Sequence, residues 1–164
     1  MDLQDITPAT STVSSAYLDD VVRGWLDCIE WTSAHYCWPG EPHNLCPVMN
    51  PDDSMLCCGH ELDDLDHGDW APDALSTARK LCSAFLAAEI AGRPGLTVAD
   101  VAEALDMSPD LVGHNLALSA GGHGTGFWDR GHGEAGDALD AAAKDVGDFQ
   151  AFLLPDLSLG LDQA

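Results

Sequence analysis

The segment Gly121-Gly-His-Gly-Thr-Gly-Phe-Trp-Asp-Arg-Gly131 combines four glycines within six residues with two aromatic and two charged side chains. Glycine destabilises a regular element by roughly 0.5–1 kcal/mol relative to alanine, so such a cluster usually marks backbone that bends as only glycine allows. His123, Asp129 and Arg130 lie close together in sequence, and His114 precedes His123 by nine residues. These side-chain types can perform acid–base chemistry or hold an anion.

A catalytic or ligand site here requires the strands expected on either side of the glycines to pair, which would bring the polar groups to one end. The catalytic candidates are His114, His123, Asp129 and Arg130. A purely structural alternative pairs Arg130 with a carboxylate, buries Phe127 and Trp128, and places His123 at the tip of a glycine turn. The glycine N–H groups could face an anion, but the segment lacks the lysine and spacing of a phosphate-binding loop.

A second group of chemically active residues lies in the long segment 33–70, which contains no Lys or Arg. Two His/Cys pairs, each with two intervening residues, are separated by ten residues. Side chains at this spacing on one tight turn can reach the same ion, and a tetrahedral zinc would hold a loop that has no core of its own. The expected zinc ligands are His43, Cys46, Cys57 and His60, with Cys37, Cys58 and His35 as alternatives. Without metal, these residues are unpaired thiols and imidazoles in an acidic loop.

The charge balance is the most unusual global property. The chain has 28 acidic and only 6 basic residues, a net charge of −22. Direct binding to nucleic acid or to an anionic membrane is not expected, because both require clustered Lys and Arg. The acidity predicts either solubility and salt adaptation or a surface that meets a strongly basic partner. The expected partner-binding acids are Asp63, Asp64, Asp66 and Asp69.

The length of 164 residues predicts one domain, residues 14–164, after a flexible leader at 1–13, with the Cys/His-rich loop at about 33–70. Residues 1–15 lack the basic and apolar regions of a signal peptide, and no apolar run approaches the roughly 20 residues of a membrane span. We therefore expect a cytoplasmic location, inside the host cell. Reduced or metal-bound cysteines are expected there, and Cys28 and Cys82 are expected in the core.

Apolar periodicity and capping residues predict an α+β fold, with a helical first half and a small antiparallel sheet packed on a helix in the C-terminal half. One expected helix begins near Ser14 and another near Ser108, and further helices are expected at 72–90, 97–105 and 134–146. The expected strands are 114–120, 125–130 and 149–154. Residues 97–116 resemble a helix-turn-helix unit. Because this stretch carries four acids and no Lys or Arg, two packing helices are expected rather than a DNA reader.

The glycine-rich motif resembles the signature of a family of small acidic proteins encoded by tailed bacteriophages, most without an assigned function. That signature has Gly-His-Asp, a short strand, Asn-Gly-His-Gly-x-Gly-Phe-Trp-Asp-Arg-Gly and a Gly-Asp-x-Leu helix. The matching positions are Gly113, His114, Gly122, His123, Gly124, Gly126 to Gly131, Gly136, Asp137 and Leu139. Weaker similarity lies at Tyr17, Trp31 to Ser33, Leu62-Asp63 and the helix from Ala71 to Phe85.

The resemblance implies a phage origin and favours a β-hairpin over a helix at 114–130. Where the family has an aromatic pair, an Arg and an Asn, this chain has Leu116-Ala-Leu-Ser-Ala-Gly121, and its Cys/His-rich loop is longer. The leading hypothesis is a phage-encoded acidic binding protein, a DNA mimic that inhibits or modulates a host nucleic-acid-handling or defence protein. The alternative is a small enzyme or ligand-binding protein whose site lies at the glycine motif.

Overall fold

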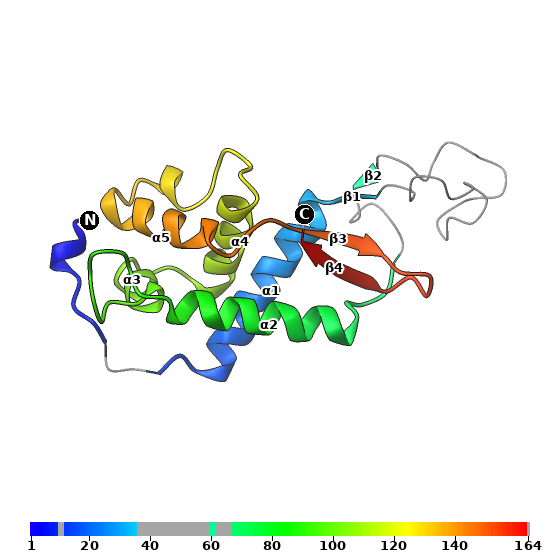
Figure 1. Ribbon diagram of the computed structural model, residues 1–164, viewed down its shortest axis with the longest axis horizontal. Coiled ribbons are helices and arrows are strands. Elements are labelled where there is room, and N and C mark those ends of the chain that lie inside the picture. The colour runs from blue at the N-terminus through cyan, green and yellow to red at the C-terminus, as the bar shows by residue number, and fades with distance from the viewer. Residues whose placement is uncertain (10–11, 36–59, 62–66, 164) are drawn as a thin grey trace.

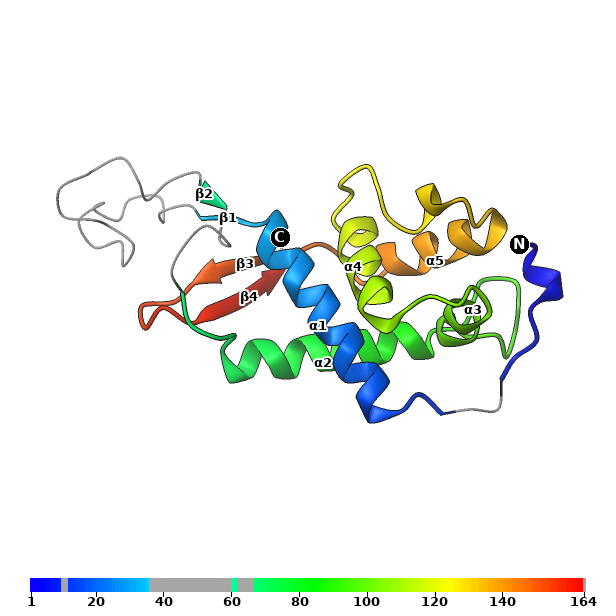
Figure 2. The same cartoon turned by 180° about the vertical axis from the view of Figure 1, so that it is seen from behind.

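The computed structural model describes residues 1–9, 12–35, 60–61 and 67–163. Its described part is an α+β fold of five α-helices and a C-terminal antiparallel hairpin that packs against the first helix (Figures 1 and 2), which confirms the predicted fold class. The helices are α1 (Ser15–Thr32), α2 (Pro72–Ala87), α3 (Val98–Ala104), α4 (Pro109–Ala120) and α5 (Glu134–Lys144). The strands are β1 (Ala34–His35), β2 (His60–Glu61), β3 (Phe149–Leu153) and β4 (Leu159–Gln163), and the 3-10 turns are η1 (Leu3–Asp5) and η4 (Trp128–Arg130).

The helices begin where their local sequence signals predict. The Ser14 hydroxyl accepts a hydrogen bond from the backbone N–H of Tyr17, at 3.1 Å, and caps α1. Thr97 and Asp100 form a reciprocal capping box at the start of α3, and Pro72 occupies the first turn of α2. Each signal satisfies or removes an N–H group that would otherwise lack a partner, so the helix starts follow from a few neighbouring residues.

α1 and α4 cross so closely that each contributes a glycine to the contact. A Cβ atom on Gly24 would lie 2.0 Å from the carbonyl oxygen of Asp110, and one on Gly113 would lie 2.0 Å from that of Val21. Any larger residue would push the two backbones apart. This crossing lies in the main core, where Trp25 of α1 and Leu116 of α4 are buried.

The predicted β-hairpin across 114–130 is wrong. Residues 114–120 continue α4, which begins at Pro109 after Ser108, and residues 128–130 form the turn η4. The stretch Leu116-Ala-Leu-Ser-Ala120 has high helix propensity, and Asn115 to Ser119 are all buried among neighbouring helices. A helix that is buried on most sides does not show the amphipathic period on which the sequence prediction depended.

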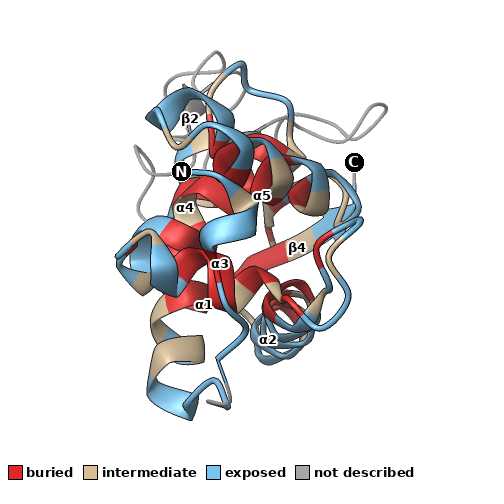
Figure 3. Cartoon of the chain, turned by 90° about the vertical axis from the view of Figure 1, so that its left-hand side faces the viewer, coloured by how far each residue is buried: buried red, intermediate tan, exposed pale blue. Residues whose placement is uncertain are grey.

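The sheet lies instead at the C-terminus, where β3 confirms the strand predicted at 149–154. β3 pairs with β4 from Phe149–Gln163 to Leu153–Leu159. Phe149 packs edge-on against Trp25 of α1, with ring centroids 5.6 Å apart, and the N–H of Ala151 donates to the Ser33 hydroxyl at 2.9 Å. These contacts fix the hairpin against the end of α1, and Figure 3 shows buried residues of β4 and the helices facing one interior.

Residues 1–9 of the predicted leader lie against the domain. Ile6 is buried, and the Arg93 guanidinium donates to the carbonyl oxygens of Leu3 and Ile6. The N–H of Ala9 donates to the carboxylate of Asp100 at 2.9 Å. This start of the chain therefore has specific contacts with the turn before α3 and with its capping box. Among the described helices, none is long and apolar enough to cross a membrane.

Candidate functional site

The glycine loop (residues 121–131) joins α4 to the turn before α5, and its conformation depends on one carboxylate. The Asp129 carboxylate accepts a hydrogen bond from the Thr125 hydroxyl at 2.6 Å and another from the N–H of Gly126 at 3.0 Å. These two bonds, in that order, hold the pKa of Asp129 below its usual value. Gly122 and Gly124 have positive φ angles of 65° and 76°. The loop is thus a capped turn that uses its acid internally.

The loop is anchored in the core by Phe127, the residue that follows Gly126. Phe127 is fully buried and packs against Phe85 of α2, with ring centroids 6.0 Å apart. Its backbone N–H donates to the buried Ser119 hydroxyl at 3.1 Å. Gly126, at φ 146°, leaves room for that hydroxyl, since a Cβ atom there would lie 2.2 Å from it. The glycines and the phenylalanine therefore perform the structural role that the sequence left as an alternative.

Of the four predicted catalytic residues, His114 and Arg130 lie near each other. Arg130 Nε donates to the side-chain oxygen of buried Asn115 at 3.2 Å and lies 3.6 Å from a carboxylate oxygen of Asp129. Burial, and then the positive charge of Arg130, lower the pKa of His114, against smaller opposite effects of Asp110 and Asp27. Its neutral form is therefore favoured.

The other two predicted residues do not join this pair in a reactive arrangement. His123 lies beyond the C-terminal end of α4, against Gly121, where the carboxylate of Asp148 also lies. Since α4 rises about 1.5 Å per residue, His114 and Gly121 lie roughly 10 Å apart along its axis. Asp129 caps the loop. Within the described residues His114 has no side-chain hydrogen bond, so no base with an orienting partner is formed.

The sequence did not indicate a role for Trp31, and it did not predict that Trp128 is exposed. Trp31, near the C-terminal end of α1, stacks on His114 with ring centroids 6.2 Å apart and planes inclined by 22°. It is 51% exposed, as is Trp128 beside Arg130, which corrects the expectation that Trp128 packs in the core. Tryptophan and arginine are enriched at protein interfaces.

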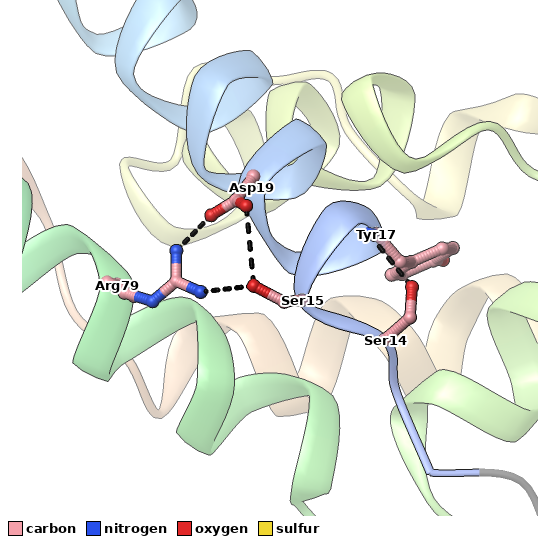
Figure 4. Close-up of polar contacts among 5 residues, drawn as sticks. All are labelled: Ser14, Ser15, Tyr17, Asp19 and Arg79. Atoms are coloured by element: carbon pink, nitrogen blue, oxygen red, sulfur yellow. Dashed lines mark hydrogen bonds and ion pairs between the residues drawn. The ribbon is translucent and has the colours of Figure 1, made fainter.

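Almost every positively charged side chain is held by a contact within the molecule. Arg23, Arg79, Arg130 and Lys144 each lie within ion-pair distance of a carboxylate. Arg93 is bound by two backbone carbonyls. Figure 4 shows Arg79 of α2 held by Asp19 and Ser15 of α1. Of the described carboxylates, only five take part in an ion pair: Asp19, Asp20, Glu30, Asp129 and Asp140.

The zinc prediction falls largely outside the described residues. His43, Cys46 and Cys57, and the alternatives Cys37 and Cys58, all lie there. The backbone of His60 is described, and it pairs with His35 where β1 meets β2. Among the described side chains, no group of three or more His, Cys, Asp or Glu could hold a metal ion.

Most of the predicted partner-binding acids also lie outside the described residues. Asp63, Asp64 and Asp66 lie outside the described residues, whereas Asp69 is exposed and its carbonyl accepts from the N–H of Leu159. The two remaining cysteines, Cys28 and Cys82, are buried as predicted, and burial raises the pKa of each thiol to about 12. They are core residues without thiolate reactivity.

The helix-turn-helix resemblance does not extend to a DNA-reading surface. α3 and α4 are joined by a turn in which Asp106 has a positive φ of 52°. The second helix, α4, is packed between α1 and α5, so most of its surface is covered. A recognition helix must expose its face to the major groove.

The chain matches no protein-family model, no curated protein and no solved structure.

Proposed function

We propose that this chain is a phage-encoded acidic binding protein that occupies the nucleic-acid-binding surface of a host protein and thereby inhibits or modulates it. A defence nuclease, a restriction complex or a polymerase has the required basic surface. The observation that carries the proposal is a net charge of −22 in which five of the six cations are already held by internal contacts. The phage origin depends on the sequence resemblance at residues 113–139.

Charge of this kind favours a basic partner because it acts over the whole surface. The summed potential attracts an oppositely charged protein and accelerates its approach. It also repels nucleic acid, which competes for the same partner surface. Since the internal ion pairs use up positive charge, little remains to neutralise the other carboxylates.

A folded scaffold distinguishes this charge from that of a disordered acidic tail. α1, α4 and α5 enclose a continuous apolar core, and the two glycines at the α1–α4 crossing bring their backbones into contact. The carboxylates on the described helices and strands are therefore displayed at fixed positions. Fixed positions cost less conformational entropy on binding than those of a flexible polyanion, so a DNA mimic on such a scaffold should exceed polyglutamate in affinity.

The test is displacement of labelled duplex DNA from purified basic proteins, including a host restriction nuclease, a polymerase and a nucleoid protein. We expect this chain to displace DNA from at least one of them at about 0.15 M salt, and to lose that ability as salt is raised. Polyglutamate of equal charge is the matched control and should displace far less. No displacement, even at low salt, would overturn the proposal, and equal displacement by polyglutamate would reduce it to unspecific charge.

The Cys/His-rich loop supplies a separate proposal, a structural zinc ion bound by His43, Cys46, Cys57 and His60. Metal analysis of the purified chain is expected to give about one equivalent of zinc. Cys46→Ser and Cys57→Ser should each lose the metal, whereas Cys28→Ala, which also removes one thiol, should retain it. A wild-type zinc content far below one equivalent contradicts this proposal.

A further inference from the structure

A groove with a volume of about 680 Å³ lies between α2 and α5, two helices seen in front in Figure 1. Ten of its thirteen lining residues are apolar and three are acidic. None of them is Lys or Arg. Neither His114 nor Arg130 lines the groove.

The apolar floor is formed by facing stripes on the two helices. On α2 and its C-terminal cap the stripe includes Leu81, Phe85 and Ala88, and on α5 it includes Ala138 and Ala142. These intervals of three or four residues place each set on one side of its helix. Alanines make up much of both stripes, so the side chains are too short to close the space between the helices.

The acids lie at the ends of these stripes and are exposed. Asp137 is in the first turn of α5, Asp145 directly follows that helix, and Glu89 follows the C-terminal end of α2. An occupant of the groove therefore meets an apolar surface along its middle and carboxylates around it. This is the complement of a helix with an apolar stripe flanked by Lys and Arg.

We infer that the α2–α5 groove is the docking site for a basic amphipathic helix of the partner protein. The inference rests on the proposed function, because it names the segment of a basic partner that this chain would grip. A second copy of this chain would bring the same negative charge to the acidic ends and be repelled. A small apolar molecule would make no use of the three carboxylates.

Fluorescence anisotropy of a labelled helical peptide of Leu and Lys tests the inference on the full-length chain. The peptide has about 18 residues, roughly 27 Å as a helix, which is longer than α5 and covers the whole groove. A peptide of identical composition, scrambled to destroy the apolar stripe, is the matched control. The wild-type chain is expected to bind the amphipathic peptide at least about tenfold more tightly than the scrambled one at physiological salt. Equal affinities would overturn the inference.

Two sets of variants locate the peptide. Changing the groove acids together (E89Q, D137N and D145N) is expected to weaken binding about tenfold, while changing three exposed acids elsewhere (D5N, D73N and D162N) should weaken it less than about threefold. Both sets have the same net charge. Ala141→Leu, which fills the groove without changing charge, should also weaken binding about tenfold. Equal losses in the two charge sets, or no loss with Ala141→Leu, would overturn the assignment.

Failure of the groove and failure of the proposed function are distinguishable. If the groove variants displace DNA from the basic protein as well as wild type does, the groove inference is wrong and the function stands. If wild type binds the amphipathic peptide but displaces no DNA from any basic protein, the proposed function fails and the groove stands. Sedimentation showing dimers that Ala141→Leu dissociates would mean that a second copy occupies the groove, and would overturn the inference.

Discussion

The glycine loop and the α2–α5 groove use their polar residues in opposite ways. In the loop, Asp129 is bound to the backbone and to Thr125, and Arg130 is bound to Asn115. In the groove, Glu89 accepts a hydrogen bond from the N–H of Gly95 at 3.2 Å, but Asp137 and Asp145 have no hydrogen bond or ion pair to any described side chain and lie exposed beside an apolar floor. The region with the most distinctive sequence is thus occupied with its own folding, whereas the region with an alanine-rich sequence has surface left for a partner.

The comparison shows that an unusual motif can be required by the fold rather than by a chemical function. Most parts of the glycine loop have a structural reason, such as room for a hydroxyl at Gly126 or anchoring by Phe127, whereas Trp128 is exposed. Substitutions in the loop should therefore act on stability, and substitutions in the groove should act on binding.

The largest effect is expected from Gly126→Ala. Its Cβ atom would lie 2.2 Å from the Ser119 hydroxyl, in a backbone region that non-glycine residues rarely adopt. We expect a loss of about 3 kcal/mol or more in the free energy of unfolding, measured by denaturant titration.

Gly122→Ala is the matched control for this substitution. Gly122 also has a positive φ, but a Cβ atom there would meet nothing within 4 Å among the described residues. Its cost should be only about 1 kcal/mol, from backbone strain alone. Equal losses at the two glycines would mean that the contact with Ser119 is not what requires Gly126.

Ser119→Ala should have the next largest effect. Removing the hydroxyl leaves the buried N–H of Phe127 without its acceptor, which costs about 1–3 kcal/mol of unfolding free energy. Ser15→Ala removes an exposed hydroxyl that bonds to Arg79 and Asp19, and should cost at most about 0.5 kcal/mol because water replaces those bonds. A similar cost for both would show that the loop is not anchored through Ser119.

The sequence predicted the elements whose signals are local. Ser14, Pro72 and the pair Thr97 and Asp100 each mark a helix start through a few adjacent residues, and the structure has helices there. It failed at 114–120 in spite of a high local helix propensity, because this helix is buried on most sides and shows no amphipathic period. Its place in the core depends on the contact of Gly113 with Val21 on a distant segment. A glycine before a short mixed stretch has no local feature that reveals such a crossing.

The candidate site was predicted only in part, for a similar reason. His114 and Arg130 are near each other, but the sequence could not show that Asp129 is used as a loop cap or that His123 lies at the far end of α4. The groove had no signal at all, because alanines on an amphipathic helix predict packing. Space between two helices becomes visible only when their relative placement is known.

Filling the groove should separate binding from stability, in contrast to the loop. Ala141 is exposed on α5, so Ala141→Leu creates no clash in the core and should change the free energy of unfolding by less than about 1 kcal/mol. The same variant is the one expected to lose peptide affinity. Denaturant titration measures the stability of this variant, and fluorescence anisotropy with the labelled peptide measures its affinity. A large loss of stability would mean that the groove, like the glycine loop, is required for the stability of the fold.

The smallest effect is expected from titration of His114, beside the loop. Because burial and the charge of Arg130 lower its pKa, the unfolded chain binds this proton more readily than the folded one. This contribution to stability is present above the ordinary pKa of 6.5 and is lost as pH falls through the lowered folded-state value. An NMR titration of the His114 ring should therefore show a midpoint below 6.5.

Substitutions of two charged neighbours should shift the titration midpoint of His114 in opposite directions. Arg130→Gln removes a positive charge and should raise that midpoint, whereas Asp110→Asn removes a negative charge and should lower it further. A midpoint at or above 6.5 in the wild type, or no response to Arg130→Gln, would mean that His114 and Arg130 do not share an environment. The loop would then be linked to α4 only through the hydrogen bonds to Asn115 and Ser119 among the described contacts, and its role would be structural.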